Sequence, residues 1–182
     1  MSELFSIQLQ NRQQQGRDGV WLDLPTTTEQ VQAALRQIGI SSDNPQGLFI
    51  SGYFAEEEKR FAIPYNMVLA SNVDELNFLA SRLETLSTGE RAELNAALQA
   101  PQSELSSIGR ITDFPENVDY YVHLPDVHGP AQLGDYYLNR SGMVDMPEEW
   151  KGGIDTAQFG RYVAQQEQGV FTEYGYLVKS GD

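Results

Sequence analysis

One short segment of the sequence contains the residue types of a metal site. His123, Asp126 and His128 lie within six residues, and two imidazoles with one carboxylate can hold a divalent metal. Pro125 and the following Gly129-Pro130 favour an irregular loop here, and the sequence indicates no fourth ligand. A metal-dependent enzyme that uses these three residues is therefore one alternative for the function.

Other catalytic motifs are absent from the sequence. It contains no G-x-S-x-G nucleophile elbow, no Walker loop and no G-x-G-x-x-G motif. The lack of cysteine excludes disulfides, thiolate zinc sites and a cysteine nucleophile. Carboxylate pairs can always be found among 26 Asp and Glu residues, so such pairs do not distinguish an enzyme from a protein without catalytic activity. We expect no catalytic residues, no bound metal and no cofactor.

The acidic residues are the strongest chemical feature of the chain. Its 182 residues include 26 Asp and Glu against 12 Lys and Arg, a formal net charge of −14. No Lys or Arg lies between Arg110 and Arg140. Five acidic residues lie in that interval: Asp113, Glu116, Asp119, Asp126 and Asp135. Aromatic residues are interspersed with them, which is typical of a folded surface rather than a disordered tail. Because like charges repel, we expect a basic protein partner rather than nucleic acid or an anionic membrane.

Composition and length indicate a folded protein. Hydrophobic residues make up 40% and aromatic residues 10%, which is enough to build a core. No apolar run approaches the roughly 18 residues of a membrane helix. The N-terminus lacks the basic-then-apolar order of a signal peptide. We therefore expect a cytoplasmic protein.

The first sixty residues predict a small β-β-α-β unit. Residues 4–9 and 20–24 alternate apolar and polar side chains, as half-buried strands do. A capping-box pattern with Thr26 at the N-cap begins a helix that Gly39 is placed to end. Residues 48–54 suggest a third strand.

The middle of the chain predicts helices. Capping patterns at 72–75 and 87–90 begin two helices, and Pro101 ends the second. The first helix carries leucines at helical spacing: Leu76, Leu79, Leu83 and Leu86. Two short helices with a tight link suggest an αα-hairpin within a small bundle.

The last third of the sequence predicts both strands and a helix. Strands are predicted at 118–122, 136–138 and 170–178, and a helix from an N-cap at Asp155 to about Gln166. The sequence thus predicts an α+β fold of three small domains: an N-terminal α+β domain (1–62), a helical middle domain (63–110) and a C-terminal α+β domain (111–182).

Five strings of residues resemble one protein family when taken in order. They are GVWLDLP, LFISGYF, NVDELNFLASRLETL, QLGDYY and GGIDTAQFGRYVAQQEQGVFTEYGYL. Their order and spacing over nearly the whole chain are similar to those of the ArdA antirestriction proteins. The most specific parts are the leucine helix at 72–86 and six closing residues: Asp155, Phe159, Gly160, Arg161, Gly175 and Tyr176. The sequence departs from the family pattern at Ile154 and Tyr162, where the family often has an aromatic and an acidic residue.

This resemblance implies a function without catalysis. ArdA proteins are carried by mobile elements, mimic bent B-form DNA and occupy the DNA groove of Type I restriction–modification enzymes. The family fold is an elongated chain of three domains that forms a homodimer through its C-terminal domain. By this resemblance, Asp and Glu stand in for phosphate oxygens. At the charge spacing of duplex DNA, 26 carboxylates would cover roughly 44 Å, about 13 base pairs.

Two sets of residues are expected to act in this function. The carboxylates expected to mimic phosphates are Glu56, Glu57, Glu58, Asp74, Glu75, Glu84, Glu90, Glu93, Glu104, Asp113, Glu116, Asp119, Asp126, Asp135, Asp145, Glu148 and Glu149. The aromatic residues expected at the dimer interface are Trp150, Phe159, Tyr162, Phe171, Tyr174 and Tyr176. A second alternative is an acidic interaction protein that binds another basic partner.

Overall fold

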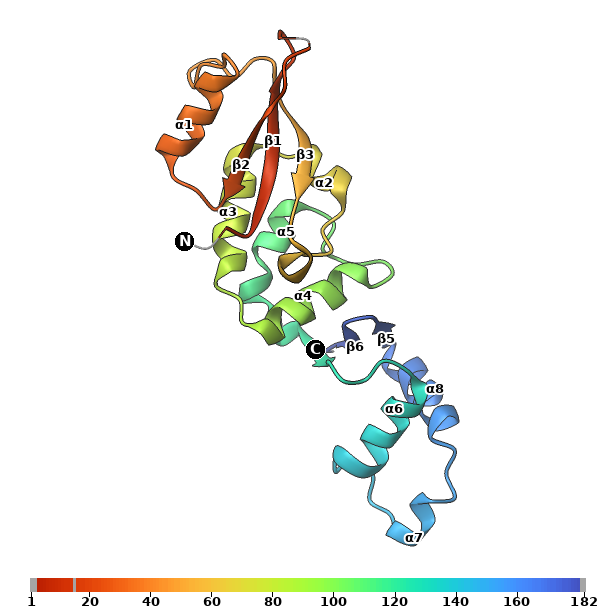
Figure 1. Cartoon of the computed structure of the whole chain (residues 1–182). Helices are drawn as coiled ribbons and strands as arrows, with labels where there is room; N and C mark the ends of the chain where they lie inside the picture. The colour runs from red at the N-terminus through yellow and green to blue at the C-terminus, as the bar shows by residue number, and fades with distance from the viewer. Residues whose placement is uncertain (1–2, 15, 181–182) are drawn as a thin grey trace. The chain divides into compact units, whose positions relative to one another are not determined.

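A computed structural model describes residues 3–14 and 16–180 of the chain (Figure 1). Its contacts group the chain into two compact units, Met1–Leu86 with Glu104–Pro115, and Ser87–Ser103 with Glu116–Asp182. Each unit combines helices with a three-stranded sheet, which confirms the predicted mixture of α and β structure. The division into three domains stays a prediction. No helix within the described residues is long and apolar enough to cross a bilayer.

The sheet of the first unit contains the three strands predicted near the N-terminus. These are β1 (Phe5–Asn11), β2 (Val20–Leu24) and β3 (Leu48–Phe54), in the order β2-β1-β3 with antiparallel pairing. Side chains of β1 alternate between buried and half-buried positions, so one face of the sheet belongs to the core.

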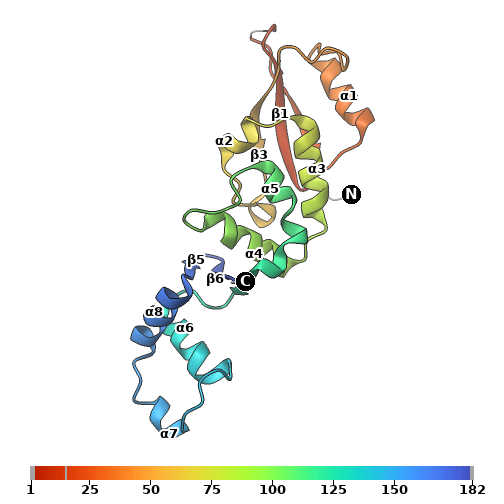
Figure 2. The same cartoon turned by 180° about the vertical axis from the view of Figure 1, so that it is seen from behind.

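Short helices complete this unit. They are α1 (Thr28–Gln37), η1 (Glu57–Lys59), α2 (Tyr65–Leu69), α3 (Val73–Glu84) and α5 (Ile108–Thr112). Helix α3 contacts both β2 and α5, and Figure 2 shows α3 beside α5 on one side of the sheet. Of the predicted leucine stripe, Leu76, Leu79 and Leu83 are fully buried in α3, as their spacing indicates, and Leu86 is buried just beyond its end.

The cap of α1 lies one residue later than predicted. Thr27, not Thr26, accepts the first-turn hydrogen bond, from the Gln30 backbone at 3.3 Å. Thr26 is instead bound twice by the Asn77 amide of α3, at 2.8 and 3.0 Å. Because this tertiary contact fixes Thr26, the helix begins after it. Gly39, at φ +70°, follows the helix end as predicted.

The second unit contains a small sheet and several helices. Its sheet contains β4 (Tyr121–Leu124), β5 (Val170–Thr172) and β6 (Gly175–Lys179), in the order β4-β6-β5. Its longer helices are α4 (Thr88–Gln99) and α8 (Thr156–Glu167). Shorter helical segments are η3 (Val118–Tyr120), α6 (Pro130–Asp135), η4 (Tyr136–Arg140) and α7 (Glu148–Lys151), and η2 (Phe114–Glu116) spans the boundary between the units. Val127, Leu133, Ala164 and Tyr176 form its buried core.

Two predicted strands of this unit were wrong. Residues 136–138 are not a strand, because the backbone continues α6 into a π-helical turn in which Ser141 donates to the Tyr136 carbonyl at 2.8 Å. Residues 170–178 are not one strand but the hairpin of β5 and β6, because the chain turns at Glu173 and Tyr174, and Gly175 begins β6 at φ +115°. The predicted N-caps Asn72, Ser87 and Asp155 are all confirmed.

Candidate partner-binding surface

The acidic side chains lie predominantly in solvent. Of the 25 Asp and Glu among the described residues, 21 are exposed and four are half-buried. The seventeen carboxylates expected to mimic phosphates include fourteen of the exposed ones. The other three, which are half-buried, are Glu84, Glu90 and Glu93. Both units carry the charge, with formal net charges of −6 and −8 from the sequence.

Local ion pairs engage some of these carboxylates. Lys59 Nζ lies 3.2 Å from Glu56, and Lys151 Nζ lies 2.7 Å from Glu148. Each pair joins neighbours within one turn of a short helix, and the acidic partners are exposed. Such surface pairs are worth about 0–1 kcal/mol, so a basic partner can displace them at little cost.

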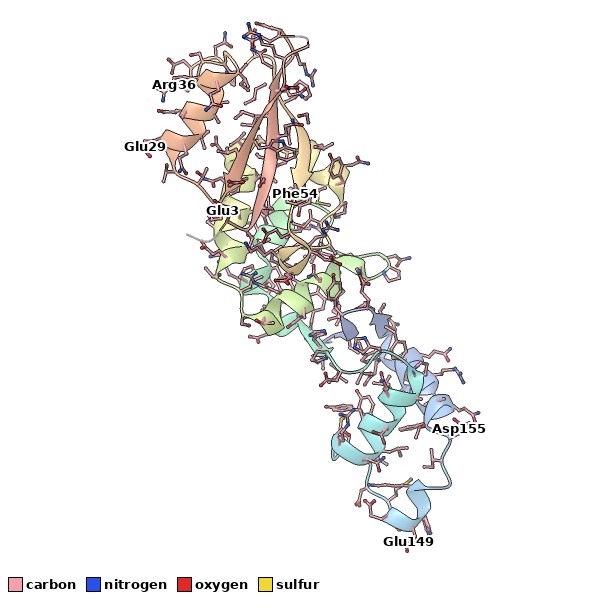
Figure 3. The ribbon with its side chains drawn as sticks, viewed as in Figure 1. Glu3, Glu29, Arg36, Phe54, Glu149 and Asp155 are labelled. Atoms are coloured by element: carbon pink, nitrogen blue, oxygen red, sulfur yellow. The ribbon has the colours of Figure 1, made fainter. Side chains whose placement is uncertain are left out.

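Several carboxylates stand at the starts of helices. Asp74 and Glu75 lie in the first turn of α3, and Glu148 and Glu149 in that of α7. Figure 3 shows Glu149 at α7 and Asp155 before α8, both pointing outward. Negative charge there interacts favourably with the helix dipole, so these carboxylates stabilise the helices that carry them.

Two neighbouring carboxylates of α4 differ in their ionisation. Glu90 closes a capping box with Ser87, and hydrogen bonding with the Ser87 side chain and backbone lowers the pKa of Glu90. Desolvation, with the charges of Glu90 and Asp119, raises the pKa of Glu93 to about 7. One Glu93 carboxylate oxygen is buried with no hydrogen-bond partner among the described residues. Glu93 is thus partly neutral near pH 7 and is a weaker phosphate mimic than its exposed neighbours.

Glu167 has a structural role that the sequence did not indicate. Its two carboxylate oxygens accept hydrogen bonds from the hydroxyls of Tyr137 and Tyr176, the latter at 2.8 Å. Desolvation and these contacts raise the pKa of both tyrosines. The carboxylate ties the end of α8 to η4 and β6, so it is not available to a partner.

The aromatic residues expected at a dimer interface do not lie in one kind of environment. Trp150 is 65% exposed and Tyr162 is 60% exposed. Phe159, Phe171 and Tyr174 are half-buried. Tyr176 is fully buried and does not supply interface area, because its ring fills the core of its own unit.

The structure does not assemble a metal site from the histidine segment. Within residues 3–14 and 16–180, no group of three or more His, Asp or Glu side chains is arranged to hold a metal ion. His123 Nε2 instead makes a hydrogen bond with the Tyr174 carbonyl at 2.7 Å, and His128 lies exposed on the loop before α6. The alternative of a metal centre at His123, Asp126 and His128 therefore lacks a geometric basis.

The QLGDYY and closing motifs meet in the structure at two glycines. A β-carbon on Gly134 would lie 1.9 Å from the Thr156 carbonyl oxygen, and one on Gly160 would lie 1.8 Å from that of Pro130. Helices α6 and α8 can therefore cross this closely only with glycine at both positions.

A family model described as "Antirestriction protein (ArdA)" matches residues 15–178. The chain belongs to the ArdA family. A comparison with curated proteins gave no match.

The acidic surface of this ArdA chain is larger than the set expected from its sequence. Seven further exposed carboxylates belong to it: Glu3, Asp18, Asp23, Glu29, Asp43, Asp155 and Glu173. Local patterns could have found two of them. Asp23 alternates with buried Leu22 and Leu24 along β2, and Glu29 lies in the first turn of α1, where polar side chains are favoured.

Proposed function

We propose that this ArdA protein mimics B-form DNA and competitively blocks the DNA-binding groove of a Type I restriction–modification enzyme. One observation carries the proposal. The interval between Arg110 and Arg140 has no basic residue, and all five of its acidic side chains are exposed. Negative charge displayed in solvent is what a DNA-binding groove, lined by Lys and Arg, is built to attract.

The mechanism would be competition rather than catalysis. Lys and Arg side chains that normally neutralise phosphates would pair with the carboxylates. Binding would release the partner's and the inhibitor's counterions, as DNA binding does. Capped helices and paired strands fix the backbone from which the carboxylates project, so the inhibitor avoids the elastic cost of bending a real duplex. No cofactor and no covalent step are needed.

The active form in this proposal is a cytoplasmic homodimer. Its gene is carried by a mobile element. Two chains display twice the carboxylates of one, roughly 26 base pairs at duplex spacing. Exposed Trp150 and Tyr162 support a contact through the C-terminal residues, since large exposed rings are favoured at interfaces. The three-domain division at residues 62 and 110 is part of the same proposal.

A gel-shift competition tests this function. The methyltransferase core of a Type I enzyme is bound to a labelled duplex with its target site, and the protein is added at rising concentration. We expect release of the duplex at low salt and a steep loss of competition as salt rises, because many screened ion pairs carry the affinity. Competition that does not change with salt would contradict mimicry.

A multiple variant separates groove binding from general acidity. Asp113→Asn, Glu116→Gln, Asp119→Asn and Asp126→Asn together should weaken competition much more than any one of them, since exposed pairs contribute about 0–1 kcal/mol each. Binding to polylysine is the control for charge alone. A wild-type protein that binds polylysine but never releases the duplex would favour the alternative of another basic partner.

A further inference from the structure

A groove in the first unit lies between the edge of the sheet and helix α1. Its lining comes from both elements, including Val20 to Asp23 of β2 and Gln30, Ala33, Ala34 and Gln37 of α1. In Figure 1 the two elements run side by side after the short turn at Pro25 and Thr26. The groove lies within one compact unit.

The strand side of this groove offers backbone hydrogen-bonding groups. Strand β2 is the outer strand in the order β2-β1-β3, and no strand among the described residues pairs with its other edge. Alternate N–H and C=O groups of an edge strand point away from the sheet and can bind another extended chain. A segment that adds to β2 would continue the antiparallel sheet by one strand.

The helix side of the groove is uncharged. Gln30, Ala33, Ala34 and Gln37 follow the spacing i, i+3, i+4, i+7, so they form one stripe along α1. The two alanines at its centre leave space for the side chains of an added strand. The glutamine amides near its ends can bind polar groups of that strand.

The charge of the lining selects the chemistry of the occupant. Of the described residues, two acidic ones line the groove, Glu3 and Asp23, and no Lys or Arg does. Both carboxylates are exposed, and Asp23 also accepts a hydrogen bond from the Ser6 hydroxyl at 2.5 Å. Figure 3 shows Glu3 and Glu29 near the start of α1 and Arg36 near its other end, so the negative charge lies at one end of the groove.

We propose that the groove between β2 and α1 binds an extended basic segment of a partner protein by strand addition to β2. The backbone of the segment pairs with the outer edge of β2, small apolar side chains contact Ala33 and Ala34, and a Lys or Arg lies against Glu3 and Asp23. The main-chain hydrogen bonds of this interaction use no carboxylate, which distinguishes them from phosphate mimicry.

Peptide titration of the isotope-labelled full chain tests the proposal. The probe is an acetylated and amidated Lys-Val-Lys-Val-Lys-Val-Lys peptide, and amide shifts are followed by NMR. We expect saturable changes at Val20 to Leu24 and at Ala33 and Ala34. Changes confined to other acidic segments, with none along β2, would overturn the proposal.

N-methylation distinguishes strand addition from attraction of charge. Two further peptides carry N-methyl groups on alternate residues, one on the lysines and one on the valines. Because only one set of N–H groups can face β2, one peptide should lose about tenfold or more in affinity while the other binds nearly as before. Equal affinity of both for the protein would overturn the proposal.

Matched charge variants complete the test. Glu3→Gln with Asp23→Asn should weaken the unmodified peptide several-fold, and the Asn oxygen can still accept from Ser6. Asp18→Asn with Asp43→Asn removes the same charge from residues that do not line the groove, and should leave affinity unchanged. Equal losses in the two variants would overturn the assignment. So would concentration-dependent shifts of β2 without peptide, because a second copy of the chain would then occupy the edge.

Discussion

The backbone nitrogen of Gly134 lies 2.9 Å from the point that a β-carbon on Gly160 would occupy. This contact joins α6 to α8 with no side chain between them, and each helix backbone also approaches a carbonyl of the other segment. The two glycines come from separate motifs of the sequence. Their tertiary contact gives these motifs a physical reason, since the second unit cannot pack without both.

Replacing Gly160 with alanine should disrupt the packing of the second unit. The added methyl would meet backbone rather than a flexible side chain, so it can be accommodated only if α6 and α8 move apart. We expect Gly160→Ala to lower the free energy of unfolding by about 3 kcal/mol or more. Denaturant unfolding followed by circular dichroism measures this change.

Gly152→Ala is the matched control for this substitution. Gly152 has φ −64°, and beyond its immediate chain neighbours no described atom lies within 4 Å of the point that an added methyl would occupy. The effect of this variant should therefore stay within about 0.5 kcal/mol. Equal stability of the two variants would show that α6 and α8 do not need close backbone contact.

The Glu167 carboxylate should stabilise the second unit through its two tyrosines. Tyr176→Phe removes one hydrogen bond to a carboxylate, which is typically worth about 1.5–3 kcal/mol. Tyr162→Phe is the control, because Tyr162 is exposed. A double-mutant cycle with Glu167→Gln should return a coupling energy for Tyr176 and none for Tyr162. Coupling of the same size for both tyrosines would argue against a specific clamp.

The hydrogen bonds of Tyr137 and Tyr176 to Glu167 also predict a loss of stability at alkaline pH. The pKa of Tyr137 and that of Tyr176 are raised in the folded state, mainly by desolvation, so folding retains protons that the unfolded chain releases. The contribution of these two tyrosines to stability should be constant through neutral pH and fall as pH rises above the ordinary tyrosine pKa of about 10. In the double variant Tyr137→Phe with Tyr176→Phe, this alkaline fall should become shallower.

Glu93 should make stability depend on pH in a lower range. The pKa of Glu93 is raised from 4.5 to about 7, so its favourable contribution is present below pH 4.5 and is lost as pH rises through 7. Glu93→Gln stays neutral at all these pH values. The difference between its unfolding free energy and that of the wild type should therefore increase in favour of the variant as pH rises from 4.5 to about 7. The exposed Glu149→Gln variant should show no such gain, and a gain of equal size there would refute the assignment.

Self-association should depend on the exposed rings of the second unit. Trp150→Ala with Tyr162→Ala should shift sedimentation toward monomer, whereas Phe78→Ala, which removes another exposed ring in the first unit, should not. Added salt screens the repulsion between two chains of charge −14 and should preserve or strengthen the dimer. A wild-type protein that is monomeric at micromolar concentration in both low and high salt would contradict the dimer.

The sequence by itself determined the features that depend on neighbouring residues. The caps at Asn72, Ser87 and Asp155 were predictable because a capping side chain binds a backbone N–H only three residues away. Strands β1 and β2 followed from alternation, and the acidic character from composition. The order of motifs along the chain was enough to indicate the family that the comparison then confirmed.

Only the tertiary structure decided which of these residues are free to act. Thr26 is not the predicted cap of α1, because its backbone binds Asn77, which lies 51 residues away along the chain. Tyr176 was removed from the candidate interface by burial, and Glu167 and Glu93 were distinguished from the other carboxylates by their surroundings. Desolvation and long-range hydrogen bonds depend on which distant segments pack together, and a local sequence pattern carries no record of that packing.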